Sequence, residues 1–414
     1  MKKIISLVLA MMIMTVSFAQ DIYGSWNGSL NAGNQSLEII FHFTHNNNTM
    51  DCYMDVPAQS LKHVHIQIVK LTETQIELKS SFLSASFKGE IMSPNLIKGT
   101  WSQPGTVLPL ELKPGSGKKI NRPQEPKEPF EYQFKEIAFQ NKKDNVWFGA
   151  TLTYPVNYKP ENDYPVVLMV SGSGQENRDE EIYSHKPFLV LADYLARHGI
   201  ASLRYDDRGI GKSTGAPWLC TTEDFTEDAK AGIEHLKKNY RFDKIGVIGH
   251  SEGGTIAFKL AAKQDVDFIV SMAGTALKGD TLMVEQMNAM NKMAGLPANL
   301  TIVHVKKILE SQSQFTPWMN YFFEYNPATT ISTVNIPVMA INGSKDFQVN
   351  SKSNLGLMRK LLKNKNAKNL IKEYSDLNHL FQHCHTGSPN EYFENEETLS
   401  PEIMKDIADW INSL

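Results

Sequence analysis

A serine with the surroundings of a nucleophile lies in the segment KIGVIGHSEGGTIAF (residues 244–258). Ser251 is the central residue of a G-x-S-x-G pattern that follows an apolar run and precedes a helical run. A sharp nucleophile-bearing turn needs this order, because small residues two places before and after the serine avoid a clash. The helix that follows would offer free N–H groups near the oxygen that becomes negative during acyl transfer. The segment therefore predicts that Ser251 is a nucleophile.

Serine is a weak nucleophile at neutral pH, so it needs a base, and the base needs an acid that orients it. Reactive groups of an open α/β sheet collect at the carboxyl ends of its strands. Asp346 ends the segment IPVMAINGSKD, and His379 lies in YSDLNHL, directly after another expected strand. Asp376 is a rival carboxylate, but it is too close to His379 in sequence to orient it from a separate strand. We therefore expect His379 to be the base and Asp346 the acid.

Acyl transfer also needs two backbone N–H groups directed at the developing negative charge. One is expected from Glu252, directly after the nucleophile, and the other from Ser173 in the glycine-rich turn SGSG (171–174). The segment YDDRGIGKS lacks the spacing of a phosphate-binding P-loop. Its Asp206 and Arg208 are instead expected to fix the loop beside the site through a local ion pair. No metal or organic cofactor is implied.

From residue 130 onward, apolar runs alternate with helical segments. Continuous apolar strands such as YPVVLMV are typical of a parallel sheet that is covered by helices on both faces. We expect an α/β fold over residues 130–414 that opens on a hairpin and is interrupted by a helical cap at 276–330. Trp318 and Phe322, in the cap segment FTPWMNYFFEY, are expected to wall an acyl pocket, and packing within a cap helix is the alternative.

The sequence before this region differs in composition and in its hydrophobic pattern. Residues 20–112 contain short alternating runs separated by Asn, Gly, Pro or Asp clusters, which predicts a small antiparallel β-domain, either a sandwich or a barrel. Residues 113–129 are rich in Pro, Gly and Lys and are expected to be a linker. Residues 1–19 combine Lys2 and Lys3 with a short apolar run and small residues at the cleavage site, as a secretory signal peptide does. We expect an exported protein, periplasmic or extracellular.

The composition is that of a globular protein, with 41% hydrophobic and 21% charged residues and a formal net charge of −3. This balance provides no basic field that would attract nucleic acid. No segment after the expected signal peptide is long and apolar enough to span a bilayer. The three cysteines are too few for a disulfide framework, and a Cys220–Cys384 pair stays open as an alternative to free thiols.

Residues 130–414 resemble the α/β-hydrolase superfamily, and more narrowly a group of secreted bacterial serine hydrolases of the esterase type. The resemblance is carried by the segments SGSG, HKPFLVLADYLARHGIASLRYDDRGIGKSTG, GVIGHSEGG, YNPATTISTVNIPVMAINGSKDFQV and LNHLFQ. It implies the α/β-hydrolase fold, with Ser251, Asp346 and His379 as a catalytic triad in the family's chain order. It also implies hydrolysis of carboxylic esters, with peptidases among the relatives. The amino-terminal region resembles the small β-domain that often precedes such hydrolases.

The leading interpretation is a secreted hydrolase that cleaves small-molecule or saccharide-linked esters, with short acyl chains, through an acyl-enzyme on Ser251. A serine exopeptidase of the same fold is the alternative. It would need carboxylates to hold the amino terminus of a substrate, for which Glu176, Asp179, Glu180 and Glu324 are candidates, although surface solvation explains them equally well. A third interpretation, a binding protein whose β-domain grips a polysaccharide or an envelope component, fits poorly with a complete triad.

Overall fold

The chain divides into two separately packed units, Met1–Lys119 and Ile120–Leu414, and each is described by itself. The computed structural model describes residues 22–414, apart from 33–34, 47–48, 60 and 312–315. The expected signal peptide, residues 1–19, lies outside the described residues.

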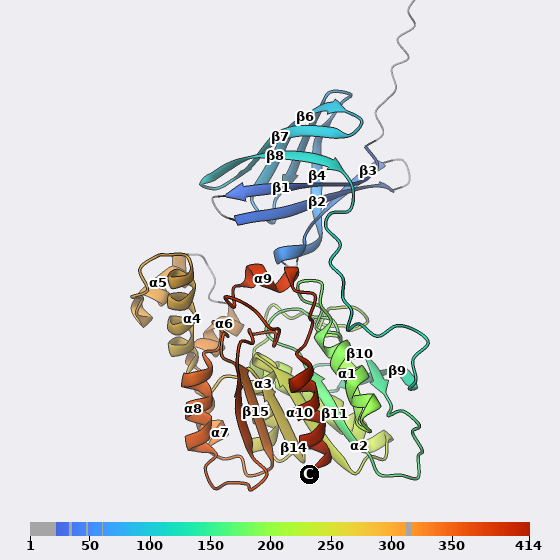
Figure 1. Cartoon of the computed structure of the whole chain (residues 1–414), viewed down its shortest axis with the longest axis vertical. Coiled ribbons are helices and arrows are strands. Elements are labelled where there is room, and N and C mark those ends of the chain that lie inside the picture. Colours follow the sequence, from blue (N-terminus) through green and yellow to red (C-terminus); the bar gives the residue numbers. More distant parts are fainter. Residues whose placement is uncertain (1–21, 33–34, 47–48, 60, 312–315) are drawn as a thin grey trace, which may run out of the picture. The chain divides into compact units, whose positions relative to one another are not determined.

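The first unit is a closed barrel of eight antiparallel strands (Figure 1). The elements are β1 (Gly24–Ala32), β2 (Gln35–Asn46), β3 (Thr49–Val56), the short 3-10 helix η1 (Pro57–Gln59), β4 (Leu61–Leu71), β5 (Gln75–Ser80), β6 (Ala85–Ser93), β7 (Leu96–Gln103) and β8 (Thr106–Pro114). Pairing of Trp26 with Pro114 joins β1 to β8 and closes the barrel. The expected antiparallel β-domain is confirmed, and it is a barrel.

Alternation along the strands builds the core of this barrel. In β3, Cys52, Met54 and Val56 are buried, while the side chains between them are partly exposed. This is the period-two pattern of a strand with one face on a core. The tryptophans of the two similar segments GSW and GTW, Trp26 and Trp101, are both buried in the same core.

The second unit is built on an eight-stranded sheet in the order β16-β15-β14-β13-β11-β12-β10-β9. Its strands are β9 (Phe134–Asn141), β10 (Val146–Thr153), β11 (Pro165–Val170), β12 (Ala201–Tyr205), β13 (Lys244–His250), β14 (Phe268–Met272), β15 (Val338–Gly343) and β16 (Leu370–Tyr374). The hairpin β9–β10 is antiparallel, and β10 joins β12 in antiparallel fashion, whereas all other neighbours are parallel. The expected α/β fold, opening on a hairpin, is confirmed.

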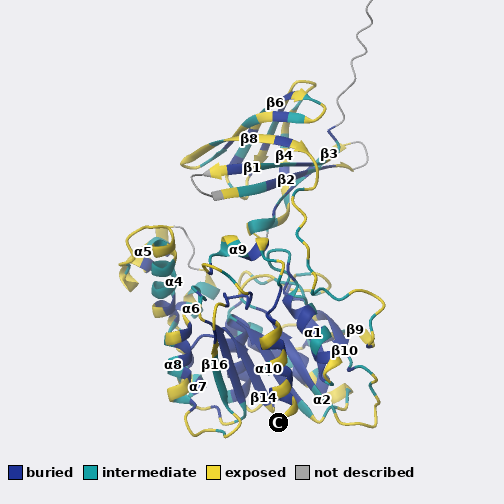
Figure 2. Cartoon of the chain, in the orientation of Figure 1, coloured by how far each residue is buried: buried dark blue, intermediate teal, exposed yellow. Residues whose placement is uncertain are grey.

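Helices cover both faces of this sheet (Figure 2). They are α1 (Pro187–Arg197), α2 (Thr222–Asn239), α3 (Glu252–Ala262), α8 (Ser351–Leu361) and α10 (Pro401–Asn412), and the short helix α9 (Pro389–Glu394) lies between β16 and α10 in sequence. Alternate residues of β11 belong to opposite cores: Val166 and Leu168 pack in the cluster with α2, α3 and α8, and Val167 and Met169 pack in the cluster with α1 and α10. Strands that are buried on both faces read as continuous apolar runs, which is why the sequence lacks alternation here.

Between β14 and β15 the chain forms the helical insertion that the sequence predicts at 276–330. It holds α4 (Gly279–Met293), α5 (Ile302–Ser311), α6 (Pro317–Glu324) and α7 (Pro327–Ile331). Helices α4 and α6 approach closely, because a Cβ atom on Gly279 would lie 1.8 Å from the carbonyl oxygen of Phe322. No helix in the described ranges is long and apolar enough to cross a membrane.

The expected linker, residues 113–129, spans the division between the two units. Its second half is bound to the second unit. The Arg122 guanidinium donates to the carbonyl oxygens of Tyr183, Ser184, Phe393 and Asn395. A segment that is poor in apolar residues is thus held by hydrogen bonds from one side chain to backbone carbonyls.

Candidate active site

Ser251 occupies the sharp turn between β13 and α3. Its backbone has φ 51° and ψ −114°, a strained conformation for a residue with a side chain. The glycines on either side are required: a Cβ on Gly249 would lie 2.0 Å from the carbonyl oxygen of Gly253, and one on Gly253 would lie 2.1 Å from that of Val170. The Ser251 N–H donates to the Met272 carbonyl at 2.8 Å, which fixes the turn against β14. The turn therefore exposes the Ser251 hydroxyl at the carboxyl edge of the sheet.

Asp346 and His379 follow the neighbouring strands β15 and β16. Their loops are joined by a bond from the Lys345 N–H to the Leu377 carbonyl at 3.0 Å. His379 Nδ1 lies 2.7 Å from Asp346 Oδ2, and both side chains are buried. The other Asp346 oxygen accepts the N–H groups of Gln348 and Val349. Asp346 is thus held from both sides in a position to orient the imidazole.

The rival carboxylate faces away from this contact. The Asp376 side chain is 61% exposed and pairs with Lys345 at 2.8 Å. Of the two carboxylates weighed from the sequence, Asp346 is the one that the structure brings to His379.

The ring of His379 is linked to the nucleophile turn through the residue before Ser251. His250 Nε2 lies 3.0 Å from the His379 carbonyl oxygen, and the two imidazole centroids are 4.8 Å apart. Within the described residues no hydrogen bond joins Ser251 Oγ to His379. In enzymes without substrate such catalytic bonds are often long and tighten in the substrate complex.

The two backbone N–H groups expected to form the oxyanion site belong to segments that flank Ser251 or the strand before it. Glu252 is the first residue of α3, where an N–H has no intrahelical acceptor. Ser173 follows β11, which pairs directly with β13. The Gly172 N–H is already taken by Glu180 Oε1 at 3.0 Å, which leaves the next N–H, that of Ser173, as the donor from this turn.

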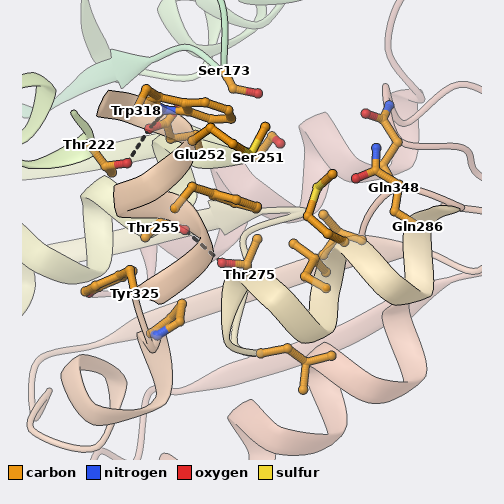
Figure 3. Close-up of a pocket in the computed structure, with 18 residues that line it drawn as sticks. Ser173, Thr222, Ser251, Glu252, Thr255, Thr275, Gln286, Trp318, Tyr325 and Gln348 are labelled. Atoms are coloured by element: carbon orange, nitrogen blue, oxygen red, sulfur yellow. Dashed lines mark hydrogen bonds between the residues drawn. The ribbon is translucent and has the colours of Figure 1, made fainter. Parts of the chain in front are cut away.

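Ser173, Ser251 and Glu252 line one cavity of about 240 Å³ (Figure 3). Its apolar wall comes mainly from the helical insertion, with Leu282, Met283, Trp318, Met319, Phe322 and, from the Asp346 loop, Val349. The two aromatic residues named from the sequence stack on each other, with centroids 5.2 Å apart and planes at 14°. Both therefore form part of the wall of the cavity that Ser251 also lines.

A link between the cap and the nucleophile turn was missed by sequence reasoning. The Glu252 carboxyl oxygen Oε1 accepts hydrogen bonds from Trp318 Nε1 at 2.8 Å and from Thr222 Oγ1 at 2.6 Å. Burial raises the pKa of Glu252, and these two donors only partly offset it. The charged residue inside an otherwise small and apolar GHSEGG segment was the available signal, since a buried carboxyl needs partners.

The expected ion pair between Asp206 and Arg208 is wrong. Arg178 forms the pair with Asp206, with Nη2 and Oδ2 2.7 Å apart, while Arg208 turns to Asp144 and Asp228. Each of the two side chains thus pairs with residues from other parts of the chain instead of with the other. The loop is still fixed by ion pairs, but not by a local one.

Three of the four carboxylates considered for an amino terminus have ion-pair partners. Asp179 pairs with Arg204, Glu324 with Lys278, and Glu180 with His250. Glu176 is surrounded by protein, and burial with the neighbouring Glu180 and Asp207 raises its pKa well above the usual range. None of the four lines the cavity at Ser251.

The remaining candidate groups show no metal or disulfide geometry in the described ranges. No cluster of three or more His, Cys, Asp or Glu side chains there could hold a metal ion. Cys52, Cys220 and Cys384 are all free thiols.

Comparison with known proteins gives one family and several relatives. The family described as serine aminopeptidase, S33, matches residues 185–317, a span that contains Ser251. The esterase EstD of Thermotoga maritima is 27% identical over 264 residues, 61% of this chain and 63% of the relative. A proline iminopeptidase of Saccharolobus solfataricus is 32% identical over 120 residues, 28% of this chain and 34% of the relative. The chain thus spans less than two thirds of the length of these relatives.

Solved structures of similar fold include the Pyrococcus furiosus esterase Pf2001, with TM-score 0.47 and 19% identity over 72% of this chain and 99% of that one. Est1E from Butyrivibrio proteoclasticus has TM-score 0.44 and 15% identity over 67% and 98% of the two chains. The strand order and the strained turn at Ser251 show that Ile120–Leu414 has the α/β-hydrolase fold, and the serine aminopeptidase family and the esterase EstD are what this unit is similar to in sequence.

Proposed function

We propose that this protein is an exported serine hydrolase that cleaves carboxylic esters of short acyl groups through an acyl-enzyme on Ser251. The observation that carries the proposal is the buried contact between His379 and Asp346 at the sheet edge where the strained Ser251 turn lies. The similarity to EstD, which is named an esterase, supports esters as the substrate class.

In acylation, Ser251 Oγ attacks the ester carbonyl carbon while His379 Nε2 accepts the hydroxyl proton. The electron pair of the carbonyl moves to its oxygen, which accepts hydrogen bonds from the N–H groups of Ser173 and Glu252. The bond to the alcohol oxygen then breaks, and His379 returns the proton to the departing alcohol. Asp346, bonded to Nδ1, maintains the tautomer whose Nε2 is free to accept the proton.

In deacylation, a water molecule takes the place of the alcohol. His379 Nε2 accepts a proton from this water as its oxygen attacks the acyl carbon, and the same proton then restores the Ser251 hydroxyl. The products are a carboxylic acid and an alcohol, so one water is consumed in each cycle.

The size of the cavity supports a short acyl group. Its volume of about 240 Å³ lies below the ~300 Å³ at which typical ligand pockets begin. The walls near Trp318 and Phe322 are apolar, which suits a hydrocarbon chain of a few carbons.

The test is turnover of p-nitrophenyl esters of increasing acyl length by the purified protein and by its Ser251→Ala variant. We expect the highest kcat/KM between acetyl and butyryl, and only background turnover by the variant. A maximum at long acyl chains would contradict the acyl preference. Equal turnover by Ser251→Ala would contradict the nucleophile.

The exopeptidase remains the second candidate, because the matching family is described as a serine aminopeptidase and one relative is an iminopeptidase. Against it, the four candidate carboxylates lie outside the lining of the cavity. An aminoacyl-anilide and the ester of the same aminoacyl group separate the two candidates. Faster turnover of the anilide, lost in Ser251→Ala, would favour the peptidase.

Export rests on residues 1–19 alone. We propose that they form a signal peptide removed after Ala19. Fractionation of expressing bacteria and amino-terminal sequencing of the product test this: a chain that begins at Gln20 outside the cytoplasm is expected, and an uncleaved cytoplasmic chain would contradict it.

A further inference from the structure

Two buried ionisable side chains lie among the catalytic loops without a part in the chemistry above. Glu180 and His250 are 2% and 6% exposed, and Oε1 of Glu180 lies 2.7 Å from Nδ1 of His250. Apolar side chains surround the pair, including Phe188, Met272 and Phe381. Ionisable groups are buried in this way only when their partners compensate for lost hydration. The contacts of Glu180 and His250 therefore indicate what the pair holds in place.

The contacts of Glu180 reach the turn that supplies an oxyanion donor. The same oxygen that faces His250 accepts the Gly172 N–H at 3.0 Å. This bond occupies the Gly172 N–H and fixes the Ser171–Gly172 peptide, which is the neighbour of the peptide that carries the Ser173 N–H. Glu180 itself has φ 52°, a left-handed conformation that a glutamate adopts only when its surroundings enforce it.

The contacts of His250 reach the other two loops. The residue directly precedes Ser251, and its Nε2 lies 3.0 Å from the carbonyl oxygen of His379. A carbonyl oxygen only accepts hydrogen bonds, so Nε2 must carry a hydrogen. Its Nδ1 faces a carboxyl oxygen that already accepts an N–H, so a second hydrogen belongs on Nδ1 and His250 is an imidazolium.

The electrostatic surroundings agree with this assignment. Burial alone would lower the pKa of His250, but the Glu180 carboxylate reverses the effect, and the His379 carbonyl and Asp346 add to it, so that the pKa is raised. Glu176 and Asp207 are the further carboxyls near Glu180. The pair therefore links an acidic region of the loops to the carbonyl of the catalytic base.

We propose that Glu180 and His250 are positioning residues, a buried ion pair that holds the Gly172–Ser173 turn, the Ser251 turn and the His379 loop in one arrangement. Three loops from different parts of the sequence meet in this pair, and each supplies one catalytic element. The inference rests on the proposed serine-hydrolase function, because its expected consequence is a loss of transition-state alignment rather than of substrate binding.

Asp228 provides a matched control. Its side chain is 3% exposed, pairs with the buried Arg208, and accepts a hydrogen bond from Asn141 at 2.7 Å. Glu180 likewise is 3% exposed by side chain, pairs with a buried cation and accepts one N–H. Glu180→Gln and Asp228→Asn therefore make the same chemical change in two buried pairs, and only the first pair touches the catalytic loops.

The experiment measures kcat, KM and thermal midpoint on the full chain with p-nitrophenyl acetate. Glu180→Gln should lower kcat by about ten- to a hundredfold, as small misplacements of catalytic groups do, with KM changed by less than about twofold. Asp228→Asn should lower the midpoint by a similar amount and leave kcat within about twofold of the wild type. Unchanged kcat in folded Glu180→Gln, or equal losses in both variants, would overturn the proposal.

A measurement on the wild type covers the case in which Glu180→Gln does not fold. Nitrogen NMR of ¹⁵N-histidine-labelled protein at about pH 7.5, above the ordinary histidine pKa of ~6.5, should show hydrogens on both nitrogens of His250. A single protonated nitrogen would overturn the ion pair. Failure of the proposed function itself is distinguishable, because the wild type would then show no ester turnover while His250 could still be an imidazolium.

Discussion

Hydrogen bonds join a serine, a histidine and an aspartate on the barrel, whereas at the catalytic edge they join the histidine and the aspartate. On the barrel, Ser25 Oγ lies 2.8 Å from His42 Nδ1, and His42 Nε2 lies 2.9 Å from Asp55 Oδ2. At the catalytic edge, His379 Nδ1 lies 2.7 Å from Asp346 Oδ2. By residue type and distance alone the barrel cluster is the more complete triad.

The backbone around each serine separates the two. Ser25 lies within β1, directly opposite His42 on β2, so its contact is an ordinary cross-strand pair. Ser251 lies on a strained turn at the start of a helix and lines a cavity together with two candidate oxyanion donors. A triad on a flat strand can move a proton but has no N–H pair for the oxyanion, which is the larger part of the catalysis. The turn, rather than the three side chains, therefore distinguishes the catalytic edge from the barrel cluster.

Removal of the base or the acid of the catalytic edge should have the largest effect on catalysis. His379→Ala should lower kcat for a short ester by about 10⁴-fold or more, and Asp346→Asn by somewhat less, because the members of a triad act as a unit. Steady-state kinetics with circular dichroism checks both. Asp376→Asn is the control and should retain kcat; if it were the more damaging carboxylate change, the acid would be misassigned.

Removal of the hydrogen bond between Trp318 of the cap and Glu252 should have a smaller effect on the kinetics. Trp318→Phe keeps an aromatic ring in the wall but removes the Nε1 bond to Glu252. Since a hydrogen bond to a carboxyl contributes about 1.5–3 kcal/mol, KM for a butyryl ester should rise by roughly tenfold, with a smaller change in kcat. Trp218→Phe, whose ring is 68% exposed, is the matched control. Identical KM values for both variants would show that Trp318 does not contribute to substrate binding.

The stability of the second unit should also depend on pH, through the carboxyl group of Asp207. Burial raises the pKa of Asp207 to about 8, although the Glu176 N–H and the Ser171 hydroxyl bond its carboxyl. A carboxyl with a raised pKa binds its proton more tightly in the folded chain, so its contribution is complete below the unfolded pKa of ~3.9 and is lost as the pH rises toward 8.

We therefore expect the thermal midpoint to fall between about pH 5 and pH 9, and less steeply in Asp207→Asn, whose side chain stays neutral. Asp409→Asn, at an exposed ion pair, should keep the wild-type slope. A wild-type slope in Asp207→Asn would show that Asp207 is ionised throughout this range.

The smallest expected effect is on the barrel itself. Ser25→Ala should leave ester turnover within about twofold, because this serine lacks the turn and the donors described above. Loss of turnover in this variant, with the fold preserved, would reverse the comparison. His42→Ala extends the same test to the histidine of the barrel cluster.

Much of the catalytic edge could be predicted from the sequence because it depends on local patterns. Ser251, Asp346 and His379 each follow an apolar run, and strand ends in a parallel sheet meet at one edge whatever their distance along the chain. The cap could be recognised for the same reason, as helical sequence that interrupts the strand–helix alternation.

Contacts between loops could not be predicted from such local sequence patterns. The Glu252–Trp318 bond and the Glu180–His250 pair depend on how loops far apart in sequence pack, and the expected Asp206–Arg208 pair was wrong because each side chain met a partner from another element. When the partner of a buried charged residue lies far away in the sequence, the only signal of the contact is the charged residue itself inside an apolar segment.

The most direct test of the central claim is labelling of the whole protein with a fluorophosphonate, which forms a covalent bond with an activated serine hydroxyl and releases fluoride. Peptide mass spectrometry should place one adduct on Ser251, with none on Ser25, and ester turnover should fall in proportion to the labelled fraction. An adduct on Ser25 in its place, or full ester turnover by a protein in which Ser251 is completely labelled, would contradict the account.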